Sequence, residues 1–311
     1  MTMTNYVLRF ALPATLLAGC TLAGGGGGTP MKVMTYNVRY SAGDKDSPDN
    51  NWDARKGDFA DLVARENPDV VGFQEVLPDQ FAWLKERFPE YEFVGVGRSA
   101  NGGGEASPVA YRRSRYETVS SGTFWLSETP DVPGSKGWDA ALPRICTYAV
   151  LKDKATDKVF AFANTHTDHR GEAARENGML LVISRMKEFS GGAPVVFVGD
   201  HNCLEYEKPA LSVSKILKDA LYVSETPPEG PWRTFNFWHY KDEELSITDA
   251  LAKSVRDRSV PGDMSDAKRI DYIYVSPEIK VLSYRTIAST RPGTKLYPSD
   301  HFPSTATIQF K

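Results

Sequence analysis

Short runs of apolar residues, each followed directly by polar residues, recur along this chain and predict buried β-strands. The clearest is the apolar run 195–198, which leads through Gly199 to Asp200 and Asn202. Because side chains alternate along an extended chain, Asp200 and Asn202 should point to one side and His201 to the other. Asp-x-Asn is also a common turn sequence, so this segment alone does not establish a site.

Five other segments have the same form. Strands are predicted over 31–37, 70–75, 160–169 and 269–275, and a further polar cluster at 297–302 precedes the last strand. Taken singly, Asn37 would be a turn residue and Glu75 a solvated acid. Asp271 is harder to dismiss, because strands are depleted in aspartate and a buried carboxylate needs a partner. Since rigid strands deliver their end residues to one rim, the clusters together predict a single functional site.

The segments between the strands show helical spacing of apolar residues. Helices are predicted around 52–63, 81–88 and 179–189, and proline or glycine follows each of them. A shorter fourth helix is predicted over 211–221, and the segment 116–162 is predicted to be mainly β. This alternation predicts an α/β protein, a four-layer αββα sandwich in which two packed mixed β-sheets are flanked by helices.

Six short motifs, taken in order, resemble the signature of the endonuclease/exonuclease/phosphatase superfamily, the deoxyribonuclease I-like fold of metal-dependent phosphoesterases. They are Tyr36-Asn37, Gln74-Glu75, Asn164-Thr165-His166, Gly199-Asp200-His201-Asn202, Ile270-Asp271-Tyr272 and Ser299-Asp300-His301. The resemblance covers residue 31 to the end, and the sequence of 164–169 is similar to the bacterial secreted branch. His201 departs from the family pattern, which has an apolar residue there. We expect a hydrogen-bonded core histidine, and the alternative is a residue that perturbs the strand or supports the site from behind.

The resemblance implies a Mg²⁺-dependent hydrolase of phosphoester bonds, with Mn²⁺ as the alternative cation. The expected catalytic residues are Asp200, Asn202, His166, Asp271 and His301. In this hypothesis Asp200, positioned by Asn202, holds the attacking water. His301, oriented by Asp271, stabilises the phosphate, and His166 contacts its opposite edge.

The expected metal ligands are Asn37, Glu75 and Asp300, because oxygen ligands of this kind suit Mg²⁺. Zn²⁺ is disfavoured, since the chain lacks the Cys/His spacing of a zinc site.

Substrate contacts are expected from residues outside these motifs. Arg144 is either a phosphate clamp or a surface arginine, and Asp168 would assist His166. Asn236 lies in the aromatic segment 232–240, which is either a stacking wall for substrate or part of the core. The glycine-rich segment 101–105 lacks the Lys-Ser/Thr of a nucleoside-triphosphate loop, so a flexible linker is expected, and an acid near the rim at Glu105 is the alternative.

The composition is typical of a globular protein, and the net charge restricts the classes of binding partner that we expect. With 311 residues, 41% of them hydrophobic, the chain can form a sizeable core. A formal charge of −3 argues weakly against a nuclease, because tight duplex binding needs many cationic contacts.

The expected partner is a phosphoester: nucleic acid, a small phosphodiester or a phospholipid. A sphingomyelinase-like activity is the first alternative, and a non-catalytic binding module is the alternative from another class. We expect a monomer.

The first thirty residues differ from the rest. Residues 1–20 are predicted to be a signal peptide, because an apolar stretch over 6–18 leads to a Leu-Ala-Gly-Cys sequence that resembles a lipobox ending at Cys20. Residues 21–30 would be a glycine-rich tether, and 31–311 the phosphoesterase domain. The expected location is the cell envelope, lipid-anchored in the periplasm or outer membrane, or secretion; an ordinary leader is the alternative. Cys146 and Cys203 could pair or stay separate.

Overall fold

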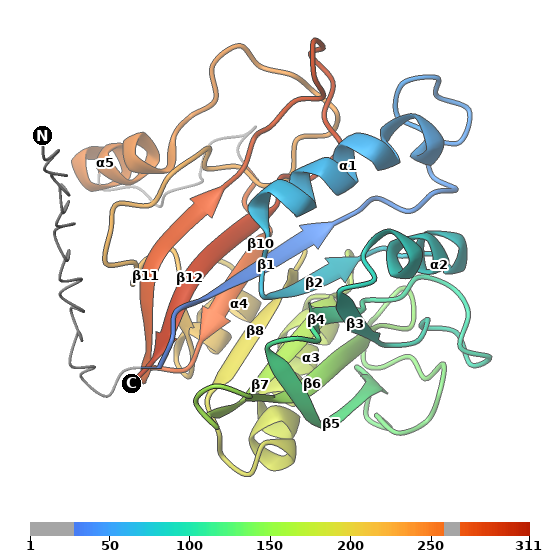
Figure 1. Ribbon diagram of the computed structural model, residues 1–311, viewed down its shortest axis with the longest axis vertical. Helices are drawn as coiled ribbons and strands as arrows, with labels where there is room; N and C mark the ends of the chain where they lie inside the picture. Colours follow the sequence, from blue (N-terminus) through green and yellow to red (C-terminus); the bar gives the residue numbers. More distant parts are fainter. Residues whose placement is uncertain (1–27, 258–267) are drawn as a thin grey trace, which may run out of the picture.

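Two six-stranded sheets form the centre of the molecule and helices cover their outer faces (Figure 1). The structure, a computed structural model, describes residues 28–257 and 268–311. The four-layer α/β sandwich predicted from the sequence is confirmed. Within the described ranges, no helix combines the length and apolar character needed to cross a membrane. The predicted signal peptide and most of the tether lie outside these ranges.

The first sheet has the strand order β11-β12-β1-β2-β4-β3. Only β1 and β2 are parallel neighbours in it, and Asn37 at the end of β1 lies beside Gln74 at the end of β2. Both strands therefore deliver their last residues to the same edge. The strands are β1 (Met31–Asn37), β2 (Val70–Gln74), β3 (Tyr91–Val94), β4 (Val109–Arg112), β11 (Ile279–Thr286) and β12 (Ser304–Phe310).

The second sheet has the order β5-β6-β7-β8-β10-β9. Its strands are β5 (Tyr116–Trp125), β6 (Ile145–Asp153), β7 (Val159–His166), β8 (Val195–Asp200), β9 (Lys218–Asp219) and β10 (Asp271–Val275). Asp200 lies directly between His166 on the parallel strand β7 and Asp271 on the antiparallel strand β10. Strand pairing thus brings three predicted site residues, distant in sequence, onto one row.

Three apolar clusters hold the layers together. The inner cluster fills the space between the sheets with residues such as Val33, Phe160 and Val198. A second cluster packs α1 (Trp52–Glu66) and α2 (Pro78–Arg87) on the first sheet, and a third packs α3 (Glu172–Phe189) and α4 (Lys208–Ser214) on the second. Burial of these faces removes apolar area from water and is the main stabilising contribution to the fold.

Three of the predicted helices are present, although α3 begins at Glu172 rather than near 179, and the fourth differs in both boundaries. α1 ends before Pro68 with Asn67 in the left-handed conformation (φ 51°). The helix predicted over 211–221 instead begins at Lys208, with Pro209 in its first turn, and ends at Ser214. The chain then turns to form β9, whose backbone pairs with β10, so backbone hydrogen bonding in the sheet replaces further helix.

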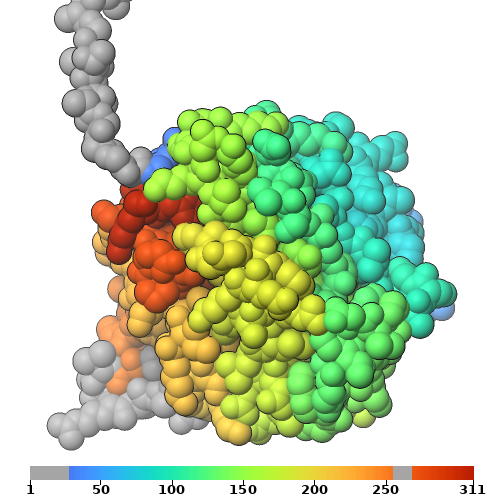
Figure 2. All heavy atoms as spheres, turned by 90° about the horizontal axis from the view of Figure 1, so that it is seen from below, coloured from blue at the N-terminus to red at the C-terminus, as the bar shows by residue number. Residues whose placement is uncertain are grey.

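Two other segments differ from the predicted elements. A fifth helix, α5 (Ile247–Asp257), was not predicted. The segment predicted to be mainly β contains a long loop, 126–144, between β5 and β6. This loop lies beside α3 (Figure 2). An ion pair between Asp131 and Arg185 at 2.7 Å joins the two.

Candidate active site

A pocket of about 500 Å³ opens where the ends of β1, β2, β7, β8 and β10 meet. Seven of the predicted site residues line it, and Asn37, Asp271, Asp168 and Asn236 do not. The predicted residues in the lining are Glu75, Arg144, His166, Asp200, Asn202, Asp300 and His301; the others are Arg39, Tyr40, Arg98, Glu105, Leu142, His169, Phe235 and Ile270.

Asp200 is the centre of the hydrogen-bond network in this pocket. Its Oδ1 accepts from the backbone N–H of Asn202 at 3.0 Å, and its Oδ2 accepts from Asn37 Nδ2 at 3.0 Å. The Nε2 atom of His301 lies 3.7 Å from the same Oδ2. Burial, together with the neighbouring carboxylate of Asp271, raises the pKa of Asp200. A carboxylate with a raised pKa is a stronger proton acceptor, as water activation requires.

The backbone around Asp200 has an unusual conformation that aims the side chains. Gly199 has φ 152°, and a Cβ atom there would lie 2.0 Å from the carbonyl oxygen of Thr165. Asn202 adopts a left-handed φ of 45°, and its Nδ2 donates to Thr167 O at 3.1 Å and to His166 Nε2 at 2.9 Å. Strained backbone of this kind persists where the surrounding structure fixes it, and it clusters at functional sites.

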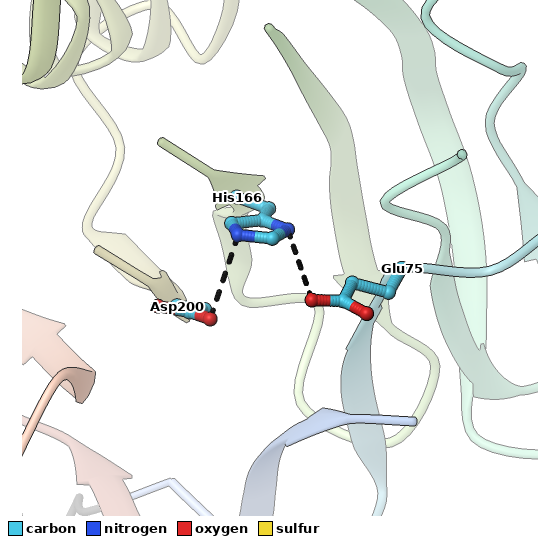
Figure 3. Close-up of side chains that lie close together, drawn as sticks. All are labelled: Glu75, His166 and Asp200. Carbon is cyan, nitrogen blue, oxygen red and sulfur yellow. Dashed lines mark ion pairs between the residues drawn. The ribbon is translucent and has the colours of Figure 1, made fainter. Parts of the chain in front are cut away.

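His166 is neutral, with its proton on Nδ1. Burial, followed by the positive charge of Arg144, holds the pKa of His166 well below its ordinary value. Its Nε2 accepts from the Asn202 amide, so Nδ1 carries the proton. Nδ1 has no hydrogen-bond partner and lies 4.0 Å from Glu75 Oε1, so His166 stands between Glu75 and Asp200 (Figure 3). This unused buried donor is free to bind an anionic oxygen.

Glu75 and Asn37 connect the first sheet to Asp200. Asn37 Nδ2 donates to Glu75 Oε1 at 3.1 Å as well as to Asp200. The other Glu75 oxygen accepts from the backbone N–H of Tyr40 at 3.1 Å, and Glu75 itself has a left-handed φ of 62°. The Asn37 Oδ1 atom accepts from the backbone N–H of Arg39 at 2.9 Å. Asn37 therefore holds two carboxylates close together by donating to both.

His301 forms a buried pair with Asp271. The distance from His301 Nδ1 to Asp271 Oδ2 is 2.9 Å, and both side chains are almost fully buried. Although burial opposes a charge, the Asp271 carboxylate raises the pKa of His301 to about 10. The ring of Phe235 covers His301 at 4.6 Å between centroids. His301 is thus an oriented imidazolium whose Nε2–H faces Asp200 and the pocket.

The carboxylates of the pocket lining, rather than its histidines, fit a hard divalent cation. Ligand atoms of Glu75, His166 and Asp200 lie within 4.8 Å of one another, as do those of Asp200, Asp271 and His301, the only such groups among the described residues. The three arginines and the His301 imidazolium only balance the four carboxylates of the pocket lining, so a bound phosphate dianion needs additional positive charge. Asp300 lies in the lining, but outside both groups, and its Oδ2 is 3.7 Å from Arg39 Nε.

Asp168, predicted to assist His166, instead organises the neighbouring loop. Its Oδ2 accepts from the backbone N–H of Ala141 at 3.1 Å and lies 3.4 Å from Arg144 Nε. Although burial opposes the charge, hydrogen bonds from the backbone N–H groups of Gly171, Arg170 and Ala141 hold the pKa of Asp168 well below its ordinary range. Arg144 is buried, lines the pocket and contacts His169 Nδ1 at 2.9 Å.

Asn236 ties the aromatic segment to the catalytic segment that contains Asp300. Its Nδ2 donates to Ser299 O at 3.1 Å, its backbone N–H donates to Asp300 O at 2.8 Å, and its Oδ1 accepts from the backbone of Trp238. The side chain is fully buried. Asn236 therefore shapes the pocket wall from behind.

Sequence reasoning missed several lining residues. Arg39 follows Asn37 by two residues, so alternation beyond the strand end could have placed it on the same side. Arg98 lies in a loop with no periodic pattern, and nothing in its local sequence points to the pocket. Phe235 was part of the aromatic segment for which a stacking wall was one of the two interpretations.

The opposite face of β8 is apolar. His201 is fully buried, with its ring 4.7 Å from that of Phe197 and 5.6 Å from that of Tyr274. The expected orientation away from the pocket is confirmed, but neither ring nitrogen has a hydrogen-bond partner of normal geometry. Cys146 and Cys203 are also buried, as separate free thiols.

Comparison with known proteins gives consistent matches over nearly the whole chain. The model of the endonuclease/exonuclease/phosphatase family matches residues 34–301. A solved endonuclease/exonuclease/phosphatase from Bacteroides vulgatus is 36% identical, with 91% of this chain and 100% of that chain covered and a TM-score of 0.78. A mannosyl-6-phosphatase from Bacteroides thetaiotaomicron is 34% identical, with 89% and 99% covered and a TM-score of 0.75.

A more distant similarity reaches a human protein. Human tyrosyl-DNA phosphodiesterase 2 is 26% identical over 183 residues, which are 58% of this chain and 44% of the human protein. The chain therefore spans less than half the length of that relative.

Proposed function

The chain belongs to the endonuclease/exonuclease/phosphatase family, and we propose that it hydrolyses small phosphoesters with a divalent cation and a water molecule activated by Asp200. The observation that carries the proposal is the convergence on Asp200 of donors from several strand ends. Asn37 and the Asn202 backbone donate to its carboxylate, while His166 and His301 face it from either side. Such a buried, fully oriented set is typical of a catalytic centre.

Each side chain has a role that follows from its protonation. Asp200 accepts a proton from the attacking water, since its raised pKa makes it a better base than an exposed aspartate. The Nε2–H of the His301 imidazolium and the Nδ1–H of neutral His166 donate to phosphoryl oxygens and stabilise the charge that develops there. Asp271 orients His301 and keeps it protonated. Asn202 fixes the His166 ring through Nε2.

Glu75 would hold the cation, with Asn37 and Asp300 as its further protein ligands. When bound, Mg²⁺ or Mn²⁺ neutralises phosphate charge and polarises the phosphoryl oxygen. To ligate it, the Asn37 carboxamide must present Oδ1, which in the structure accepts from the backbone of Arg39. Glu75 is the principal candidate, because its carboxylate faces both His166 and Asn37.

The dimensions and charge of the site favour a small substrate. A pocket of about 500 Å³ suits a compact phosphoester, and the mildly acidic chain lacks the cationic surplus of a protein that binds duplex DNA tightly. The similarity to the Bacteroides thetaiotaomicron mannosyl-6-phosphatase supports a phosphomonoester of a small alcohol as the first candidate.

A phospholipid phosphodiesterase is the second candidate, and an exposed aromatic residue beside the pocket favours it. Phe237 is 49% exposed and packs at a tilt against Phe235, a pocket residue, with 3.8 Å between ring centroids. Aromatic side chains exposed in this way can enter the interface of a lipid surface. Preferential hydrolysis of sphingomyelin in vesicles, lost in Phe237→Ser, would establish this candidate over the first.

The test is a hydrolysis panel of p-nitrophenyl phosphate, bis-p-nitrophenyl phosphate, plasmid DNA and sphingomyelin vesicles. The protein is stripped with chelator and assayed before and after addition of Mg²⁺ or Mn²⁺. We expect activity only after metal addition, largest on the monoester, and absent in Asp200→Asn. Asp131→Asn, which removes an exposed acid on the 126–144 loop, is the matched control and should retain activity. Hydrolysis that is indifferent to chelator would contradict the proposal.

We further propose that the protein is lipid-anchored through Cys20 in the cell envelope. Support comes only from the sequence, since Cys20 lies outside the described residues. Membrane fractionation of cells that express the full chain should place it with the membranes, and Cys20→Ser should release it into the soluble or secreted fraction. An unchanged distribution would argue for an ordinary leader.

A further inference from the structure

One wall of the pocket is formed by a rigid ion pair that the hydrolytic mechanism does not use. Arg98 and Glu105 form a fork, with Nη1–Oε2 at 3.0 Å and Nη2–Oε1 at 2.7 Å, and each side chain is 17% exposed. The loop that carries them is closed by a backbone hydrogen bond from Arg98 N–H to Glu105 O at 3.0 Å. Trp125 Nε1 donates to Arg98 O at 2.7 Å. The wall is therefore preorganised.

This wall lies next to the catalytic centre. Arg98 and Glu105 line the main pocket, and they also line a small recess of about 10 Å³ together with Glu75, Arg144 and His166. A substrate whose phosphate contacts His166 would therefore bring its alcohol portion within reach of the Arg98–Glu105 pair. Two largely buried ionised side chains that take no part in the chemistry are costly to keep unless they have another role.

The charge balance of this region indicates which groups it recognises. Arg98 is paired with Glu105, and Arg144 with Asp168 at 3.4 Å, so the formal charges cancel. A second phosphate would need a surplus of positive charge, which is absent here. Guanidinium donors beside carboxylate acceptors instead match hydroxyl groups, because each hydroxyl both donates and accepts.

We propose that Arg98 and Glu105 form a subsite for the hydroxyl groups of the leaving alcohol, so that the preferred substrate is the phosphomonoester of a polyhydroxylated alcohol such as a sugar. This inference rests on the proposed function and specifies its substrate class. In the reaction, the water oxygen bonds to phosphorus as its proton passes to Asp200, the bond between phosphorus and the alcohol oxygen breaks, and the alcohol oxygen takes up a proton, so the products are inorganic phosphate and the neutral alcohol. Arg98 and Glu105 neither donate nor accept the transferred proton; they determine specificity.

The test compares two substrates with the same kind of leaving group. Mannose 6-phosphate and cyclohexylmethyl phosphate both release a primary alcohol on a six-membered ring, but only the former carries ring hydroxyls. Inorganic phosphate release gives kcat/KM for the wild type, Glu105→Gln and Arg98→Gln. We expect each variant to lose about 10- to 100-fold on the sugar phosphate, as for a lost hydrogen bond to a charged group, and less than about 3-fold on the cyclohexylmethyl ester.

Controls separate a specificity role from a structural one. Arg98→Lys should recover part of the lost sugar-phosphate activity, and Asp131→Asn, which breaks an ion pair away from the pocket, should leave the ratio of the two substrates unchanged. Equal losses on both esters would show that the pair only holds the loop, and an unchanged ratio with full activity would show that it touches no substrate; either result overturns the inference. Hydrolysis of the cyclohexylmethyl ester by the wild type reports the proposed function separately.

Discussion

Asp200 and His201 are neighbours in sequence, equally buried and both ionisable, yet they lie in opposite environments. Asp200 faces the pocket, where Asn37, the Asn202 backbone and His301 surround its carboxylate. His201 faces the layer beneath, where its ring stacks among aromatic side chains and its nitrogens are unpartnered.

The difference shows that burial alone does not identify a catalytic residue. Burial raises the pKa of Asp200 and lowers that of His201, so each is pushed toward its neutral form. Only Asp200 also has oriented donors and a neighbouring space for a substrate. The network around a buried group, and the pocket it faces, are therefore what distinguish function from packing.

Replacing Asp200 should have the largest effect on activity and should not lower the stability of the fold. Asp200→Asn removes the proton acceptor, so kcat should fall by roughly 1000-fold or more. The same change removes the repulsion between the buried carboxylates of Asp200 and Asp271, so the melting temperature should stay equal or rise. Phosphate-release assays and thermal unfolding measure the two quantities. A large loss of both would mean that Asp200 is needed mainly for folding.

The Asp271–His301 pair should give the next largest effect. Asp271→Asn leaves a hydrogen-bond acceptor at Nδ1 but removes the charge that holds the pKa of His301 at about 10. The imidazolium then loses its proton at lower pH, and we expect about a 100-fold drop in kcat at neutral pH with partial recovery on acidification. A pH profile of kcat for this variant tests whether Asp271 keeps His301 protonated. A profile parallel to that of the wild type would contradict this role.

Removal of the principal metal ligand should act through metal affinity. Glu75→Gln keeps the side chain's shape and removes its charge, so the Mg²⁺ concentration for half-maximal activity should rise more than about 10-fold. Glu105→Gln removes an acid from the same pocket that is not among the expected metal ligands and is the matched control. Equal metal dependence in the two variants would place the cation elsewhere.

His201→Phe should have the smallest effect on activity and should stabilise the fold in acid. The pKa of His201 is lowered from 6.5 to about 3, so between these values the unfolded chain binds a proton that the folded chain excludes. The free energy of unfolding therefore decreases as the pH falls below about 6.5, and the decrease reaches about 2 kcal/mol at pH 5. Phenylalanine removes this loss. Denaturant unfolding of the wild type and of His201→Phe at pH 5 and pH 8 measures this decrease. An identical pH dependence of stability in the two proteins would contradict the prediction.

The sequence predicted the sheets and the strand-end site because both depend on local patterns. Alternation placed Asp200 and Asn202 on one side and His201 on the other, and apolar runs located the central strands. The hydrogen-bond partners of Asp168 were missed because these backbone N–H groups, at 141 and 170–171, belong to loops without periodicity. Arg98 was missed for the same reason.

Helix α5 was missed although a local pattern was available. Ser246 precedes it and bonds reciprocally with Asp249, with Ser246 Oγ accepting from the Asp249 backbone and donating to its carboxylate. This is the Ser-x-x-acid arrangement of a capping box. Helix α5 is therefore predictable from its local sequence, whereas the loops that carry Arg98 and Asp168 depend on tertiary contacts that no local pattern contains.

The most direct test of the account is a side-by-side measurement of kcat/KM for metal-dependent phosphate release by Asp200→Asn and His201→Phe. The two substitutions affect adjacent, equally buried residues on opposite faces of one strand end. We predict a loss of roughly 1000-fold or more for the first and a value within about 3-fold of the wild type for the second. Similar values for the two variants would contradict the assignment of catalysis to the pocket face of β8.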